Sequence, residues 1–238
     1  MSKRAIILAG GKGTRLRPYT VVLPKPLMPV SDYSILEIII RQLAYYGFDK
    51  ITMAVNHQAE IIKAFFGDGS KWGVEIDYSL EKKPLSTMAP LKLIPDLPDD
   101  FLVMNGDILT DLNYKDFFEN HVANKNIFTI SSYHRSHTME YGVLETNKQN
   151  NLIGFTEKPK VDYQVSMGIY MVSKKALDFI PEDTKFGFDD LMLALLDKNL
   201  SPKVEEFSNY WMDIGRPDDY MKAIEDFESM KSKLLPNE

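Results

Sequence analysis

Apolar runs alternate with glycine- and proline-containing turns along the first half of the chain. Residues 4–9 and 101–105 are short and almost wholly apolar, as is typical of parallel strands buried on both faces. After Ser34, a residue type that favours helix N-termini, apolar positions recur with helical spacing up to Tyr46. The pattern predicts strands at 4–9, 51–55, 74–80 and 101–105, and helices at 34–46, 58–66 and 90–94. This alternation predicts an α/β fold.

The second half has more strands and fewer helices between them. Its patterns predict strands at 127–133, 141–145, 152–156, 167–172 and 204–207, and helices at 114–123, 174–180, 188–197 and 217–230. A polar turn at 147–150 joins two of these strands. We therefore expect a mixed, mostly parallel central sheet flanked by helices, in a single domain of residues 1–230. Residues 231–238 are predicted to be a frayed tail.

Composition narrows the classes of function. The chain has 238 residues, 44% of them hydrophobic, and a formal net charge of −6, which argues against nucleic acid as a partner. It contains no cysteine, so disulfides and thiolate metal sites are excluded. No apolar run approaches the ~20 residues that span a bilayer, and no signal peptide is recognised. We expect a soluble, cytoplasmic protein with no membrane partner.

The loop after the first strand carries the main candidate chemistry. It reads Gly10-Gly11-Lys12-Gly13-Thr14-Arg15-Leu16-Arg17-Pro18. Glycines at the carboxyl end of a buried strand leave backbone N–H groups open to a phosphate. Arg15 adds a planar set of donors, and Lys25 adds a second cation between two prolines. Together they predict a polyphosphate site.

Two common glycine motifs do not fit this loop. The dinucleotide-binding fingerprint requires G-x-G-x-x-G, and Leu16 stands where its third glycine should be. The P-loop requires G-K-[ST] at its end, whereas Lys12 precedes Gly13 here. A nicotinamide-dependent oxidoreductase is therefore disfavoured.

Several charged residues follow predicted strands. Asp107 and Asp213 each follow an apolar or aromatic run near a glycine, and such carboxylates are ligands that Mg²⁺ prefers when phosphates complete its shell. As isolated residues, both would equally suit turns. Glu157 and Lys158 are candidates for hydroxyl groups and a second phosphate, with a solvated hairpin turn as the alternative. The four histidines, at positions 57, 121, 134 and 137, show no metal-binding spacing.

These motifs, in this order, resemble the sugar-1-phosphate nucleotidylyltransferases. The segments that carry the resemblance are residues 8–18, 24–27, 106–107, 141–143, 157–159 and 211–217. It implies a Rossmann-like nucleotidyltransferase fold with a nucleotide-binding half at about 1–112 and a sugar-binding half at about 113–230. It also implies a minimal catalytic unit.

In that family, a sugar 1-phosphate attacks the α-phosphorus of a nucleoside triphosphate and pyrophosphate leaves. The resemblance implies Arg15 and Lys25 as catalytic residues and Asp107 and Asp213 as ligands of Mg²⁺. It implies nucleotide binding by Leu8, Gly10, Gly11, Gly13, Thr14, Glu81 and Ser86. It implies sugar-phosphate binding by Gly142, Glu157, Lys158 and Gly168. The partners would be the nucleoside triphosphate and the sugar 1-phosphate.

One loop departs from the family pattern. Where relatives usually carry L-G-T-[AG]-G, this chain reads Leu85-Ser86-Thr87-Met88-Ala89. If that loop needs a positive φ, Ser86 would cost about 1 kcal/mol or more. This departure keeps open a non-catalytic regulatory homologue that only binds a nucleotide sugar.

The base is inferred mainly from Glu81. It lies in a stretch similar to that of mannose-1-phosphate guanylyltransferases, and a carboxylate can accept both adjacent donors of guanine. Residues 211–215 also resemble the guanylyltransferase version, and in extent the chain is similar to the heptose-1-phosphate guanylyltransferases. GTP is therefore favoured, with uridylyl, cytidylyl or thymidylyl transfer as alternatives. The sequence does not fix the sugar, and it leaves the oligomeric state open, a homo-oligomer included.

Overall fold

The computed structural model describes residues 3–11, 13–56, 58–81 and 83–236. Within them, a seven-stranded sheet has the order β12-β8-β11-β6-β1-β4-β5. Its strands are β1 (Lys3–Leu8), β4 (Phe48–Val55), β5 (Glu75–Leu80), β6 (Asp100–Asn105), β8 (Phe128–Thr138), β11 (Lys160–Ser173) and β12 (Lys203–Phe207). Strands β5, β4, β1 and β6 are mutually parallel, and β11 is antiparallel to both β6 and β8. The predicted mixed, mostly parallel sheet is confirmed.

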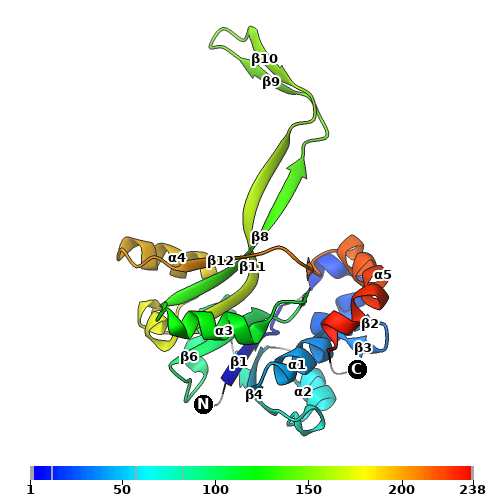
Figure 1. Ribbon diagram of the computed structural model, residues 1–238, viewed down its shortest axis with the longest axis vertical. Helices are drawn as coiled ribbons and strands as arrows, with labels where there is room; N and C mark the ends of the chain where they lie inside the picture. Colours follow the sequence, from blue (N-terminus) through cyan, green and yellow to red (C-terminus); the bar gives the residue numbers. More distant parts are fainter. Residues whose placement is uncertain (1–2, 12, 57, 82, 237–238) are drawn as a thin grey trace.

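Helices cover both faces of this sheet (Figure 1). They are α1 (Ile35–Tyr45), α2 (Ala59–Phe66), α3 (Tyr114–Ala123), α4 (Phe188–Asp197) and α5 (Pro217–Leu234). Ser34 caps α1 as predicted, because its side chain accepts a hydrogen bond from the Glu37 amide at 3.1 Å. Among the described residues, no helix is long and apolar enough to cross a membrane.

Two layers of core explain the wholly apolar strands. On β1, Ala5 and Ile7 face the layer under α1, α2, α3 and α5, whereas Ile6 faces the layer under α4 and two 3₁₀ helices. On β6, Met104 faces the first of these layers and Val103 faces the second. Both faces of these central strands are buried, as the apolar runs predict.

Short elements complete the body. Six 3₁₀ helices are described: η1 (Thr14–Leu16), η2 (Tyr19–Val21), η3 (Lys25–Leu27), η4 (Ser70–Trp72), η5 (Ala89–Leu93) and η6 (Lys174–Phe179). The last two stand where helices were predicted at 90–94 and 174–180. Three two-stranded ladders pair β2 (Pro29–Val30) with β3 (Tyr33–Ser34), β7 (Ile108–Thr110) with β13 (Trp211–Asp213), and β9 (Val143–Thr146) with β10 (Leu152–Thr156).

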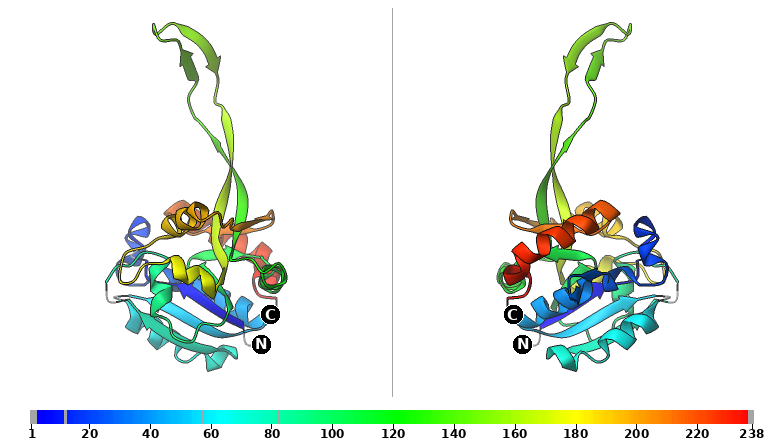
Figure 2. Two further views of the ribbon diagram at one scale, coloured as in Figure 1. Left: turned by 90° about the vertical axis from the view of Figure 1, so that its left-hand side faces the viewer. Right: turned by 90° about the vertical axis from the view of Figure 1, so that its right-hand side faces the viewer.

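Three predicted boundaries are clearly wrong. The tail expected to fray from Lys231 instead continues α5 to Leu234, and Leu234 and Leu235 are buried in the core. The other two errors lie in β8 and β11, which run well past the predicted limits of 127–133 and 167–172. Their outer halves form a ribbon that rises from the body and carries β9 and β10 at its end (Figures 1 and 2). We call residues 134–165 the arm.

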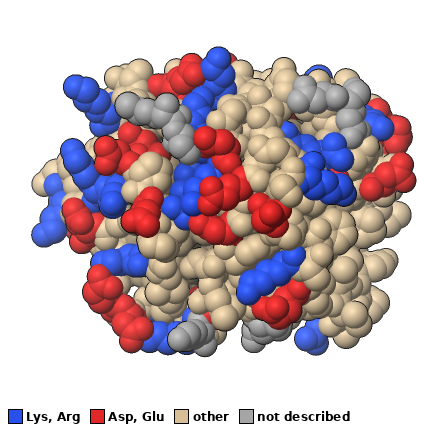
Figure 3. Space-filling model, turned by 90° about the horizontal axis from the view of Figure 1, so that it is seen from below, with Lys and Arg blue, Asp and Glu red and all other residues tan. Residues whose placement is uncertain are grey.

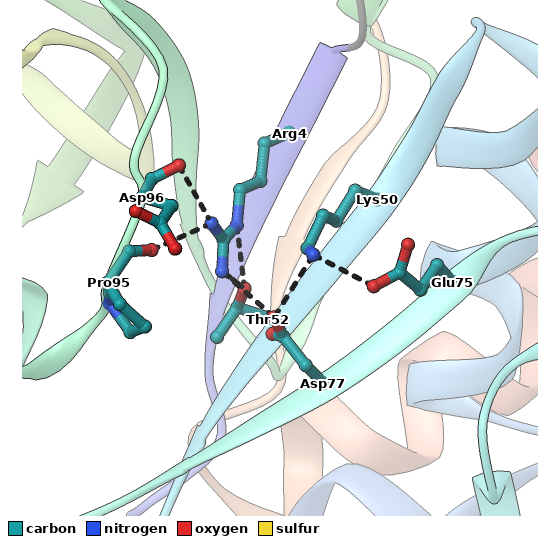
Figure 4. A network of polar contacts seen from close by, with 7 residues as sticks. All are labelled: Arg4, Lys50, Thr52, Glu75, Asp77, Pro95 and Asp96. Carbon is teal, nitrogen blue, oxygen red and sulfur yellow. Dashed lines mark hydrogen bonds and ion pairs between the residues drawn. The ribbon is translucent and has the colours of Figure 1, made fainter.

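The amino end of the sheet is held by a buried arginine. Arg4 on β1 donates to Thr52 Oγ1 at 2.7 and 2.9 Å, to Asp77 at 2.9 Å, and to the carbonyls of Pro95 and Asp96 (Figure 4). It therefore joins β1, β4 and β5 to the turn before β6. The face of the body away from the arm carries interspersed basic and acidic side chains (Figure 3).

Candidate active site

The carboxyl ends of β4, β1 and β6 lie side by side and surround the glycine-rich loop. The loop leaves β1 after Leu8, and its position is fixed by neighbours on both sides, since the Ala9 amide donates to the Ala54 carbonyl at 2.9 Å and the Gly106 amide donates to the Leu8 carbonyl at 3.1 Å. Ligands of open α/β sheets bind at such an edge. Lys12, within the loop, is outside the described residues.

Gly13 has to be a glycine for two reasons. Its φ is +60°, a conformation that side chains rarely adopt. A Cβ there would lie 3.0 Å from Thr20 Cγ2 and 3.3 Å from Lys25 Cβ. Thr20 also donates to the Gly13 carbonyl at 2.6 Å. The close packing at Gly13 therefore sets the distance between the loop and Lys25.

A cleft of about 880 Å³ opens over this edge. It is lined by the predicted nucleotide-binding residues Leu8, Gly10, Gly11, Glu81 and Ser86, by the predicted catalytic residue Lys25 and by the predicted metal ligand Asp107. Arg17 and Lys83 add two further cations to its wall. The structure thus brings most of the predicted nucleotide-binding residues into one cleft large enough for a nucleotide.

Lys25 and Asp107 meet inside the cleft. Lys25 is 8% exposed, and its ammonium donates to Asp107 Oδ2. The other carboxylate oxygen of Asp107 is buried and has no hydrogen-bond partner. A buried carboxylate oxygen without a donor is costly unless a cation or a ligand proton reaches it.

Asp213 lies beside Asp107 because β13 pairs with β7. Asp213 is opposite Ile108 in this ladder, and the Ile214 amide donates to the Asp107 carbonyl at 3.1 Å. Burial raises the pKa of Asp213, and the carboxylate of Asp107 reinforces this shift, while Lys25 and Arg15 oppose it. Two adjacent carboxylates, one with an unpartnered buried oxygen, fit a hard divalent cation such as Mg²⁺. No group of three or more potential ligands occurs among the described residues, so water and phosphate would complete its shell.

Arg15 reaches the same neighbourhood from η1. Its guanidinium lies 3.3 Å from the position of a Cβ on Gly215, just after Asp213. Thr14, also on η1, is exposed and does not line the cleft. A Cβ at residue 215 would therefore be in tight contact with the end of the exposed Arg15 side chain.

Glu81 and Asn56 close the other side of the glycine-rich loop. Glu81 Oε1 accepts the Leu85 amide, and Glu81 Oε2 lies 3.6 Å from the position of a Cβ on Gly10. Asn56, directly after β4, donates to the Gly10 carbonyl. Our sequence interpretation missed Asn56, although a polar residue at the end of an apolar strand is a usable signal.

Ser86 adopts the conformation that the usual glycine would favour. Its φ is +72°, so the condition for backbone strain is met. The neighbouring loop holds it there, since the Met88 amide donates to the Phe186 carbonyl at 3.1 Å and the Phe188 amide donates to Thr87 Oγ1 at 2.9 Å. The base-binding role of Ser86 stays a prediction.

The residues predicted to bind the sugar phosphate are divided. Gly168 has a φ of +76° and packs against Asn105, which lines the cleft. Gly142, Glu157 and Lys158 instead lie on the arm, next to β9 and β10, and none of them lines the cleft. The structure does not bring these three to the cleft of their own chain (Figures 1 and 2).

Comparisons with known proteins agree with this fold. A family model described as nucleotidyl transferase matches residues 4–230, and the chain belongs to that family. The resemblance inferred from the motifs is thereby confirmed.

Named relatives differ in base and in length. The UTP–glucose-1-phosphate uridylyltransferase of Synechocystis is 34% identical, over 93% of this chain and 62% of the relative. The D-glycero-alpha-D-manno-heptose 1-phosphate guanylyltransferase of Campylobacter jejuni is 31% identical, over 91% of this chain and 96% of the relative. The crystal structure of HddC from Yersinia pseudotuberculosis complexed with GMP-PN has a TM-score of 0.70 and 28% identity, over 94% of this chain and 99% of that one. The chain thus spans less than two thirds of the cyanobacterial relative.

Proposed function

We propose that this protein transfers a nucleoside monophosphate from a nucleoside triphosphate, with GTP favoured, to a sugar 1-phosphate and releases pyrophosphate. The observation that carries the proposal is the Lys25–Asp107 pair, with its unpartnered carboxylate oxygen, at the mouth of the glycine-rich loop. Cations, backbone donors and carboxylates converge there, which suits a triphosphate with a divalent cation.

In this reaction an oxygen of the sugar phosphate attacks the α-phosphorus, and the bond from the α-phosphorus to the bridging oxygen of pyrophosphate breaks. Lys25 holds the reacting phosphates in line, and Arg15 stabilises the negative charge of the departing pyrophosphate. Asp107 and Asp213 would hold Mg²⁺, which when bound neutralises phosphate charge as a Lewis acid. No protein nucleophile is required, because the sugar phosphate supplies it.

Glu81 supports GTP as the donor. Its carboxylate lies at the cleft wall beside Gly10, and a carboxylate can accept both donors that guanine presents on its Watson–Crick edge. The Campylobacter relative is named a guanylyltransferase, and HddC was crystallised with GMP-PN. The Synechocystis relative is named for UTP and favours uridylyl transfer as the alternative.

A panel of substrates tests the proposal. Purified protein with Mg²⁺ is incubated with each common nucleoside triphosphate and with the 1-phosphates of mannose, glucose, glucosamine and heptose, and pyrophosphate release is followed. We expect release with GTP, and a loss of about 10–100-fold in kcat/KM for GTP in Glu81→Gln. Release with UTP alone would contradict the guanine assignment.

The strained Ser86 favours a second candidate, a regulatory homologue that binds a nucleotide sugar without turnover. If the protein is such a homologue, no combination of substrates should release pyrophosphate, while calorimetry should still show binding of a nucleotide sugar. If Ser86→Gly then restores release, the chain is an enzyme slowed by its loop. If it does not, the regulatory reading replaces the catalytic one.

A further inference from the structure

The arm exposes apolar side chains that a folded protein usually covers. At its end, Leu144 on β9 and Phe155 on β10 are paired across the ladder and are 62% and 59% exposed. Further exposed apolar residues of the arm are Met139, Tyr141, Leu152, Ile153, Val161 and Tyr163. A two-stranded ribbon by itself is marginally stable in water, and contiguous apolar surface of this kind marks an interaction site.

The end of the arm nevertheless has a defined local structure. The Asn147 amide donates to the Asn151 carbonyl at 3.0 Å, and this closes the turn between β9 and β10. Gly142 packs directly against Phe155 and Glu157, because a Cβ there would lie 2.6 Å and 3.0 Å from them. The exposed surface is therefore a formed hairpin that presents Glu157 and Lys158 at its base.

In the described residues of the arm that pair with each other, 134–138 and 160–164, the ladder has no break at which the arm could bend back to its own cleft. Pairing of β8 with β11 is unbroken from Thr138–Lys160 to Ser132–Ser166, and its register shifts only between Ser166 and Tyr170, inside the body. The Met139 amide then continues the ribbon by donating to the Pro159 carbonyl at 3.0 Å.

Trp211 anchors the arm where it leaves the body. The Arg135 guanidinium lies over the Trp211 ring, 4.6 Å from its centroid, and the Tyr133 ring packs on the same indole at 5.2 Å. Trp211 itself donates to the Met167 carbonyl at 3.1 Å. Folding the arm back would break this stacking and many ladder hydrogen bonds.

The cleft of one copy is not lined by the side chains predicted to bind the sugar phosphate. Lys25, Arg17 and Lys83 give it cations for a triphosphate, whereas Glu157 and Lys158 stand on the arm. A second phosphate bound next to a triphosphate is stabilised by a further cation. The arm carries such a cation in Lys158.

We propose that two copies of this chain exchange arms, so that Glu157 and Lys158 of one copy complete the sugar-phosphate side of the other copy's cleft. The exchange is reciprocal and gives a closed two-fold dimer. It covers the apolar end of each arm with the body of the partner. The catalytic part of this inference rests on the proposed function, whereas the exchange itself does not.

Mixing two inactive variants tests the exchange. Lys25→Met damages the body and leaves the arm intact, while Lys158→Ala damages the arm and leaves the body intact. Co-expressed with different tags, they form mixed dimers in which one of two sites is undamaged, so about a quarter of wild-type activity returns. If the mixture is no more active than the single variants, or if Lys158→Ala alone is fully active, the proposal is wrong.

A second measurement does not depend on activity. The chain contains no cysteine, so Lys158→Cys in one tagged copy and Gln58→Cys, at the cleft wall, in the other are its only thiols. A bismaleimide should join the two differently tagged chains. Lys71→Cys, exposed on η4 at the amino end of β5, is the control partner and should not react. Absence of the first cross-link overturns the exchange.

Sedimentation separates the outcomes when no substrate is turned over. Thr138 and Lys160 are paired, so an Asn-Gly turn can replace residues 139–159 and close the ribbon. We expect a wild-type dimer and a monomeric shortened variant. A wild-type monomer, or a shortened variant that still dimerises, overturns the proposal. Wild-type protein that is a cross-linked dimer but inactive with every substrate would instead refute the proposed function alone.

Discussion

Lys25 neutralises one carboxylate oxygen of Asp107 and leaves the other buried without a partner. The same lysine therefore does not satisfy the whole carboxylate, and the remaining oxygen is left without a partner. If Asp107 holds a metal ion as proposed, this division lets a single aspartate interact with a protein cation and with that ion. The position of Lys25, which packs against Gly13, would then affect the proposed metal site.

The first prediction concerns Asp213. Asp213→Asn keeps the shape of the side chain but removes the charge next to Asp107, so we expect pyrophosphate release to fall by about 10²–10³-fold. The Mg²⁺ concentration for half-maximal activity should rise as well. Asp218→Asn, an exposed aspartate in the first turn of α5, is the matched control. Equal activities of the two variants would contradict the metal assignment.

The second prediction concerns the strained serine. Ser86→Gly removes the Cβ from a residue at φ +72°, and we expect the free energy of unfolding to rise by about 1 kcal/mol. Turnover should rise too, because the loop lines the cleft. Lys125→Gly is the control, because Lys125 has a φ of +51° and is exposed on the loop after α3. This substitution should stabilise the protein without changing its turnover. A gain in turnover from both variants would show that the effect is not local.

The third prediction separates backbone strain from crowding at Gly13. Gly13→Ala places a methyl group within 3.0 Å of Thr20 and 3.3 Å of Lys25, so it should lower kcat/KM by at least about tenfold through displacement of Lys25. Gly47→Ala has the same kind of positive φ, at +80°, but meets nothing within 4 Å. It should cost about 1 kcal/mol of stability and leave kcat/KM unchanged. If the two variants lose activity alike, crowding is not the cause.

The sequence predicted the centre of this molecule better than its periphery. The wholly apolar runs predict the strands of the sheet, and the spacing of the glycines predicts the loop. Both features depend on the local sequence alone. The ladder of β7 with β13 was missed, since three-residue strands have no measurable periodicity. It is this ladder that brings Asp213 to Asp107.

The arm shows a different limit. Its ribbon is polar on β8, where residues 134–138 are exposed on both faces, so no buried face exists to produce alternation. Val161, Tyr163 and Val165 do alternate on β11, and this was the available signal for a longer strand. The direction of the arm cannot be predicted from such a pattern. It depends on the contact of Arg135 with Trp211, which is far away in the sequence.

The fourth prediction concerns pH and stability. His121 is fully buried, with its ring nitrogens 2.7 Å from Thr129 Oγ1 and 3.3 Å from Asp100. Burial lowers the pKa of His121 below its ordinary value of 6.5, against the opposing effect of Asp100. The unfolded chain therefore binds a proton more readily than the native one, so the contribution of His121 to stability is present above pH 6.5 and is lost as pH falls below it.

Urea unfolding at pH 7.5 and pH 5.5 measures this contribution. The loss of stability on acidification should be smaller in His121→Gln than in the wild type, even though the variant is less stable at pH 7.5. His137→Gln, on the exposed part of β8, should lose as much stability on acidification as the wild type does. An unchanged loss in His121→Gln would refute the linkage.

The last prediction concerns the arginine at the amino end of β1. Arg4→Met leaves Asp77 and the carbonyls of Pro95 and Asp96 without their buried donor, so we expect a loss of about 2–4 kcal/mol in the free energy of unfolding. Lys50 belongs to the same network, but it contacts Glu75 and Asp77 at the surface (Figure 4).

Lys50→Met is therefore the matched control and should cost less than about 1 kcal/mol, because surface ion pairs contribute little. Arg4 stands at the amino end of β1 and the glycine-rich loop at its carboxyl end, so kcat/KM of folded Arg4→Met should equal that of the wild type. Chemical unfolding and pyrophosphate release measure the two effects separately. Equal destabilisation by both substitutions would show that burial of the guanidinium is not what holds β1, β4 and β5 together.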